Sequence, residues 1–110
     1  MIFVTGPLFA GKRETIRGLL GLTEEEFAAC AAWDVQERAL EAEPEELAEE
    51  LSANRVVIAT EVGGGVVPID PVERRRREAA GRLACALARR ADTVIRVCCG
   101  LPELLKGEWP

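Results

Sequence analysis

Gly6-Pro7-Leu8-Phe9-Ala10-Gly11-Lys12-Arg13 is the stretch of this sequence that decides the fold. It contains the pattern G-x-x-x-x-G-K, directly after the apolar run 1–5 and at the start of a segment with helical periodicity, 11–20. In such a loop, successive backbone N–H groups and the helix N-terminus surround a phosphate, and the lysine neutralises its oxygens. We therefore predict a phosphate-binding loop here, with Lys12 as its cation. The alternative is an ordinary strand-to-helix turn.

The residue after the lysine departs from the usual pattern. This position normally carries Ser or Thr, whose hydroxyl ligates Mg²⁺, whereas this chain has Arg13. A guanidinium has no lone pair to offer a cation. Arg13 therefore either adds a phosphate contact, replaces the charge of the metal, or marks a loop that no longer turns over nucleotide. Thr15 is not expected to substitute, because it points about 200° around the helix from Arg13.

Strands and helices are predicted to alternate along the chain. The expected strands are 1–5, 55–60 and 93–99, and the expected helices are 11–20, 35–52 with an interruption at Pro44, and 70–91 with a capping box at Asp70 and Glu73. This alternation indicates parallel strands joined by right-handed crossovers. We predict one α/β domain over residues 1–110, with three layers and a mainly parallel sheet of about four strands.

Two segments are harder to assign. Thr23 and Glu26 have capping-box spacing and Ala is abundant after them, which favours a helix. The run 27–33 nevertheless has no polar residue and ends at Asp34, which suits a buried strand. The tail after Gly100 is expected to be a short helical turn or a docked coil.

Composition limits the classes of partner and compartment. The net charge of −5 argues against broad nucleic-acid binding. No apolar run reaches the roughly 20 residues of a membrane span, and no signal peptide is visible. Four cysteines without a Cys-x-x-Cys pair, and the absence of His, argue against zinc. We expect reduced core thiols, including Cys98 and Cys99, and a cytoplasmic protein. Because a core of this size is thin, a homo-oligomer would help to stabilise it.

Candidate site residues follow the expected strands, where ligands bind in parallel sheets. Asp34 would hold Mg²⁺ through water, or else cap the next helix. Glu61 would act as a general base or contact a substrate hydroxyl or amide, or else accept hydrogen bonds from nearby glycine N–H groups. A substrate loop would follow Glu61, with Arg82 on the long helix either joining it or merely solvated. The loop contains Gly63, Gly64, Gly65 and Pro68.

The second half of the chain resembles a known family. The matching stretches, in order and with matching spacing, are 57–68, 77–83, 91–94, 100–102 and 105–106. They are similar to the bifunctional adenosylcobinamide kinase / adenosylcobinamide-phosphate guanylyltransferase family, in which a strand ending in Asn-Glu-Val-Gly precedes Gly-Ile-Val-Pro. The most specific part is Glu-Val-Gly-x-Gly-x-Val-Pro at 61–68.

The resemblance implies a RecA-like nucleotide-binding sheet, GTP or ATP with Mg²⁺ as cofactors, cobinamide as the acceptor, a role in cobalamin biosynthesis, and a homotrimer. In it, 6–12 match the nucleotide loop. Asp34 looks like the family's metal-binding acid at a strand end, which is why we favour a strand at 27–33. The implied sheet order is last strand, first, third, then 27–33. Residual kinase chemistry would use Lys12, Asp34 and Glu61.

The departures from the family limit what this chain is expected to do. Family members are considerably longer and transfer the guanylyl group through a covalent His intermediate, yet this sequence contains no His. Thr60, Ala84 and Cys85 also differ from the family's usual Asn, Asn and Gln. We expect a divergent kinase-like protein that binds a nucleotide or another phosphate-bearing ligand, with guanylyl transfer lost. The alternatives are a non-catalytic binding or regulatory subunit and a structural oligomeric subunit.

Overall fold

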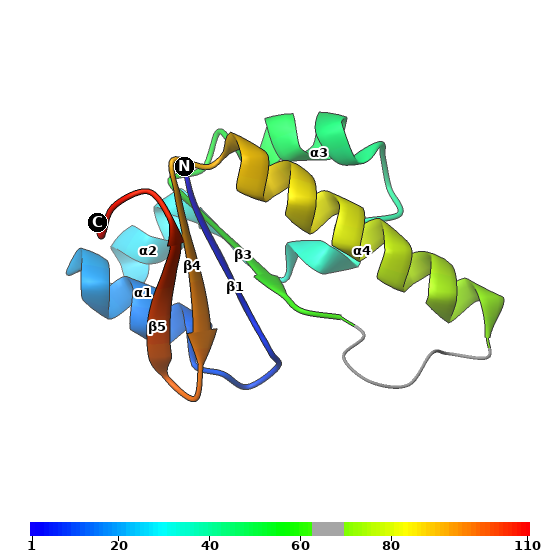
Figure 1. Cartoon of the computed structure of the whole chain (residues 1–110). Coiled ribbons are helices and arrows are strands. Elements are labelled where there is room, and N and C mark those ends of the chain that lie inside the picture. Colours follow the sequence, from blue (N-terminus) through cyan, green and yellow to red (C-terminus); the bar gives the residue numbers. More distant parts are fainter. Residues whose placement is uncertain (63–69) are drawn as a thin grey trace.

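The computed structural model describes residues 1–62 and 70–110, in which the strands form one sheet of order β2-β3-β1-β4-β5 (Figure 1). The strands are β1 (Ile2–Gly6), β2 (Ala31–Ala32), β3 (Val56–Thr60), β4 (Thr93–Cys98) and β5 (Leu101–Lys106). Strands β1 to β4 are parallel, and β5 runs antiparallel to β4. The α/β class and the order of the first four strands are confirmed. The predicted substrate-loop residues Gly63, Gly64, Gly65 and Pro68 lie outside the described residues.

Helices cover both faces of this sheet and give the predicted three layers (Figure 1). They are α1 (Lys12–Leu20), α2 (Glu24–Cys30), the 3₁₀ helix η1 (Val35–Arg38), α3 (Pro44–Leu51) and α4 (Pro71–Arg90). Alternate residues of each strand point to opposite faces, so Phe3 packs with η1, α3 and α4, and Val4 packs with α1 and α2. The expected helix 35–52 is two separate helices, and Pro44 opens the second as predicted.

The prediction of a strand over 27–33 is wrong for most of its length. The Thr23 hydroxyl accepts a hydrogen bond from the Glu26 N–H at 3.1 Å, and the Glu26 carboxylate accepts one from the Thr23 N–H at 3.0 Å. This reciprocal cap starts α2, which buries Phe27 against the sheet. Only Ala31–Ala32 pair with β3. The local helix signal therefore outweighed the apolar run, which suits a buried helix as well as a strand.

The tail after Gly100 is a strand, so the expected helical turn or coil is also wrong. Cys99 (φ 53°) and Gly100 (φ 72°) both have left-handed backbone and form the two-residue turn between β4 and β5. The turn leaves Cys98 and Cys99 exposed, and Cys85 is exposed on α4. The expectation that the thiols lie in the core is thus corrected. Within 1–62 and 70–110, none of the helices combines the length and apolarity needed to cross a bilayer.

Candidate functional site

The glycine-bounded loop makes a sharp turn between β1 and α1. Gly6 has φ 155°, and a Cβ there would lie 2.1 Å from the Val97 carbonyl oxygen on β4. Gly11 has φ 80° and occupies the N-cap of α1. The Gly100 N–H donates to the Ala10 carbonyl at 2.8 Å, so the β4–β5 turn supports the loop from the side. The backbone thus has the strand–loop–helix course that a phosphate-binding loop requires.

Lys12 is the buried cation of this loop. The residue is only 8% exposed, and its Nζ donates a 2.7 Å hydrogen bond to the Pro7 carbonyl. Burial lowers the pKa of Lys12, while the nearby charges of Asp34 and Glu61 act in the opposite direction. The ammonium group is therefore placed inside the turn and close to both predicted carboxylates.

An open pocket of about 270 Å³ joins the loop to the end of the second strand. Its lining includes Lys12, Arg13, Asp34 and Thr60. Leu8, Phe9, Ala10 and Gly11 of the loop contribute to the same pocket, as do Glu14, Trp33 and Ile58. Asp34 precedes η1 with φ 55°, but its side chain makes no capping hydrogen bond. Asp34 therefore occupies the N-cap position of η1 without a side-chain capping hydrogen bond, and this exposed residue lines the pocket.

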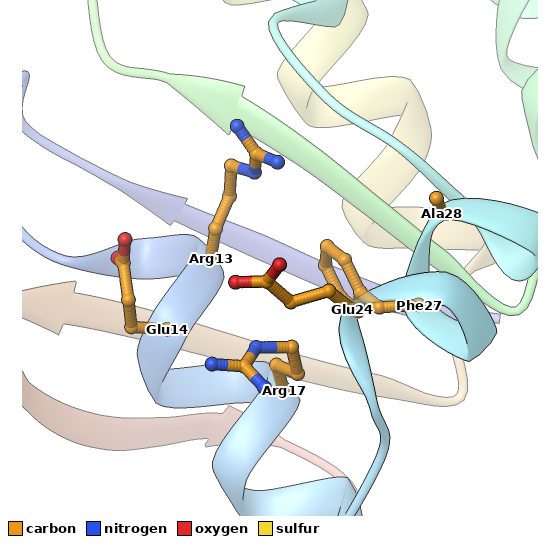
Figure 2. A pocket seen from close by; sticks show the side chains of 6 residues that line it. All are labelled: Arg13, Glu14, Arg17, Glu24, Phe27 and Ala28. Carbon is orange, nitrogen blue, oxygen red and sulfur yellow. The ribbon is translucent and has the colours of Figure 1, made fainter.

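Arg13 rests on an aromatic stack that the sequence analysis missed. Its guanidinium carbon lies 4.3 Å from the centroid of the Trp33 ring, and Trp33 stacks on Phe27 with centroids 6.1 Å apart and planes inclined by 14°. A hollow of about 210 Å³ next to Arg13 is also lined by Arg17 of α1 and Glu24 of α2. Figure 2 shows these three side chains. The signal in the sequence was Trp33, an aromatic residue directly before Asp34, the acid expected at the strand end.

Glu61 is held by a second cation that the sequence analysis missed. The Arg96 guanidinium donates to both carboxylate oxygens, at 2.7 Å from Nε and 3.0 Å from Nη2. This hydrogen bonding lowers the pKa of Glu61. Arg96 comes from β4 and its side chain spans β1, whose Thr5 is its neighbour in the sheet. An arginine inside the apolar strand Thr93–Cys98 was the signal that could have revealed the pair.

The structure gathers only some of the predicted residues. Glu61 lines a second hollow next to the loop pocket, and Thr60 lines both the hollow and the pocket. Arg82 is elsewhere: it lines hollows between α3 and α4 together with Glu43 and Pro44. The loop, Asp34 and Glu61 thus meet at the carboxyl edge of the sheet, without Arg82.

Among the residues that the structure describes, those at this edge do not form a complete Mg²⁺ site. P-loop proteins hold the ion with the hydroxyl that follows the lysine and with a strand-end acid. Asp34 offers a carboxylate, but Arg13 stands in place of the hydroxyl. The positively charged Arg13 guanidinium lies over the Trp33 ring, and both residues line the same pocket. A divalent ion beside that charge is repelled.

Comparison with known proteins agrees with the fold. Residues 16–105 match the family described as cobinamide kinase / cobinamide phosphate guanyltransferase. A bifunctional adenosylcobalamin biosynthesis protein, CobP of Pseudomonas aeruginosa, is 41% identical over 59 residues, which are 54% of this chain and 34% of that protein. The matched part thus spans about a third of that relative. The loop at 6–13 precedes the family match.

Proposed function

The chain belongs to the cobinamide kinase / cobinamide phosphate guanyltransferase family, and from this premise we propose that it binds the phosphates of a nucleotide, GTP or ATP, or of another phosphate-bearing ligand in cobalamin biosynthesis. The observation that carries the proposal is Lys12, a buried lysine that lines the pocket at the start of α1, in a loop bounded by Gly6 and Gly11. Membership alone would not locate the site, because the loop lies outside the matched segment.

The loop offers a phosphate the groups it needs. The N–H groups of the first turn of α1 have no partner within the helix, and the helix dipole adds positive potential there. Lys12 Nζ has three donors, one of which is used on the Pro7 carbonyl. A phosphate oxygen carries more negative charge than a carbonyl oxygen, so it would compete well for this ammonium group.

Catalysis is a narrower proposal than binding. In a residual kinase reaction Lys12 would hold the transferred phosphate and Glu61 would orient the acceptor hydroxyl, since the low pKa that Arg96 imposes on Glu61 makes it a weak proton acceptor. Guanylyl transfer through a histidine is not proposed, because these 110 residues contain none. Arg13 in place of the metal-binding hydroxyl favours the second candidate function, a subunit that binds phosphate without turnover.

The experiment is a calorimetric titration of GTP, ATP and inorganic phosphate into the wild-type chain, Lys12→Ala and Lys106→Ala. The last is a matched control, because Lys106 is the only other lysine and its Nζ donates to the Ala88 and Arg89 carbonyls away from the loop. Loss of a charged hydrogen bond should weaken binding to Lys12→Ala by about tenfold to a hundredfold. The proposal fails if the wild-type chain binds none of the three, or if Lys12→Ala binds as it does.

A further inference from the structure

We propose that Arg13, held against Trp33, replaces the divalent cation of this site, so that the loop binds phosphate groups without Mg²⁺. This inference rests on the proposed function and deepens it. It identifies the Arg13 guanidinium as a second positive charge that binds the phosphate, and Trp33 as the side chain that positions it.

Arg13 is in the right place to share a phosphate with Lys12. The two residues are consecutive in the first turn of α1, and both line the loop pocket. Arg13 is exposed, but its guanidinium is not unsupported, because it lies over the Trp33 ring at 4.3 Å. A cation over an indole face is attracted by the ring quadrupole, and Trp gives the strongest attraction of the aromatic side chains.

The aromatic support is itself fixed. Trp33 stacks on Phe27, which is 3% exposed and packs into the core under α1 and α2. Phe27 is held by α2, whose first turn carries the Thr23 capping box. A guanidinium anchored in this way loses little freedom when it binds a ligand, and such preorganisation raises affinity.

The chemistry of the guanidinium fits the role. Mg²⁺ in phosphoryl-transfer sites bridges phosphate oxygens and neutralises their charge. Arginine presents planar N–H donors that bind phosphate in a bidentate manner and stays charged at every physiological pH. Of the charged groups that line the pocket, Lys12 and Arg13 are positive and Glu14 and Asp34 negative, with Glu61 acting on Lys12 from the neighbouring hollow. A phosphate group bound beside Lys12 meets two neighbouring cations, which together take over the charge neutralisation that Mg²⁺ otherwise supplies.

The experiment measures GTP affinity by calorimetry in EDTA and in excess MgCl₂. Wild type should bind in EDTA at least as tightly as in MgCl₂. Arg13→Ser should lose about tenfold or more in EDTA and recover with MgCl₂, because it restores the metal-binding hydroxyl. Arg17→Ser, an arginine-to-serine change one turn along α1, should behave as wild type and serves as the matched control.

Two Trp33 variants test the anchor. Trp33→Leu keeps the charge of Arg13 and removes its support, so GTP binding in EDTA should weaken about three- to tenfold, with no recovery in MgCl₂. Trp33→Phe retains an aromatic face and should fall between Trp33→Leu and wild type. In a Trp109→Phe background Trp33 is the sole tryptophan, and its fluorescence should change when GTP binds in EDTA.

The outcomes separate the two proposals. No GTP binding by wild type in either buffer overturns the proposed function and this inference together. Binding only in MgCl₂ overturns the inference and leaves the proposed function standing. Metal-free binding that is unchanged in both Trp33→Leu and Trp33→Phe, with no fluorescence response, overturns the role of Trp33.

Discussion

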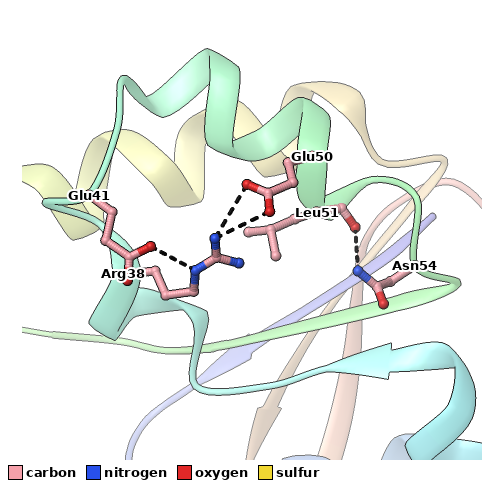
Figure 3. Close-up of polar contacts among 5 residues, drawn as sticks. All are labelled: Arg38, Glu41, Glu50, Leu51 and Asn54. Carbon is pink, nitrogen blue, oxygen red and sulfur yellow. Dashed lines mark hydrogen bonds and ion pairs between the residues drawn. The ribbon is translucent and has the colours of Figure 1, made fainter.

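The two faces of the sheet are covered in different ways. The face under α3 and α4 buries the larger apolar cluster, and its charged groups stay at the rim: Arg38 of η1 pairs with Glu41 at 3.0 Å and with Glu50 of α3 at 3.3 Å (Figure 3). The face under α1 and α2 has a smaller cluster, and the loop beside it buries Lys12 and seats Arg13 on Trp33. Rim ion pairs contribute little to stability. The comparison indicates that one face mainly stabilises the fold and the other supports the candidate site.

The largest expected effect comes from breaking the stabilising face. Leu87 of α4 is fully buried in its cluster, so Leu87→Ala should lower the free energy of unfolding by about 2–5 kcal/mol through lost burial and a residual cavity. Urea denaturation measures the change. Leu101→Ala, at a side chain that is 71% exposed, is the control and should change stability little.

If the two faces have separate roles, the folded fraction of Leu87→Ala should still bind GTP with wild-type affinity. A loss of affinity larger than the loss of folded protein would show that the α4 face also shapes the site. The comparison would then fail.

A substitution in the loop should affect stability less than Leu87→Ala does and should affect ligand binding more. A Cβ at Gly6 would meet the Val97 carbonyl oxygen at 2.1 Å, so Gly6→Ala must shift β1 against β4 and should cost about 2 kcal/mol. It should also weaken GTP binding, because the loop begins at this residue. Denaturation and calorimetry on the same variant measure both.

Gly18→Ala is the matched control for Gly6→Ala. Gly18 lies within α1, and a Cβ there would meet no atom within 4 Å. Replacing a helical glycine by alanine should raise stability by about 0.5–1 kcal/mol. The steric argument is contradicted if the two variants change stability in the same direction.

Much of the fold could be predicted from local patterns. The apolar runs before Gly6, after Arg55 and after Asp92 each became a parallel strand, because strands buried on both faces need no polar alternation. The tail was missed because its pairing depends on a turn at Cys99 and Gly100 and on β4 having a free edge. Neither feature is a property of the tail's own sequence.

The candidate site could be predicted only in part, for a related reason. The loop and Lys12 belong to one continuous motif, whereas the partners of Arg13 and Glu61 come from distant segments. Which arginine meets which partner is fixed by strand order: β1 separates β3 from β4, and Arg96 reaches across it. A sequence pattern identified the carboxylate of Glu61 but could not reveal what neutralises it.

The smallest expected effect on stability comes from the ion pair between Glu61 and Arg96, which lies between the stabilising face and the candidate site. Hydrogen bonding from Arg96 lowers the pKa of folded Glu61, whereas an unfolded Glu has a pKa of about 4.3. The pair therefore stabilises the fold fully above that value, and the contribution is lost as the pH falls through the folded pKa. Because both side chains are more than a third exposed, solvent screening limits the effect at pH 7 to about 0.5 kcal/mol.

Glu61→Gln should accordingly be less stable than wild type at pH 7, with the difference closing at low pH. Urea denaturation at several pH values measures it, and Glu49→Gln, an exposed change on α3, controls for the loss of a negative charge. A difference that persists unchanged at low pH would mean that Glu61 acts through packing. If the difference in stability instead vanishes at low pH, Glu61 acts through its ion pair with Arg96. That pair then links the end of β3 to β4, the strand whose turn supports the loop.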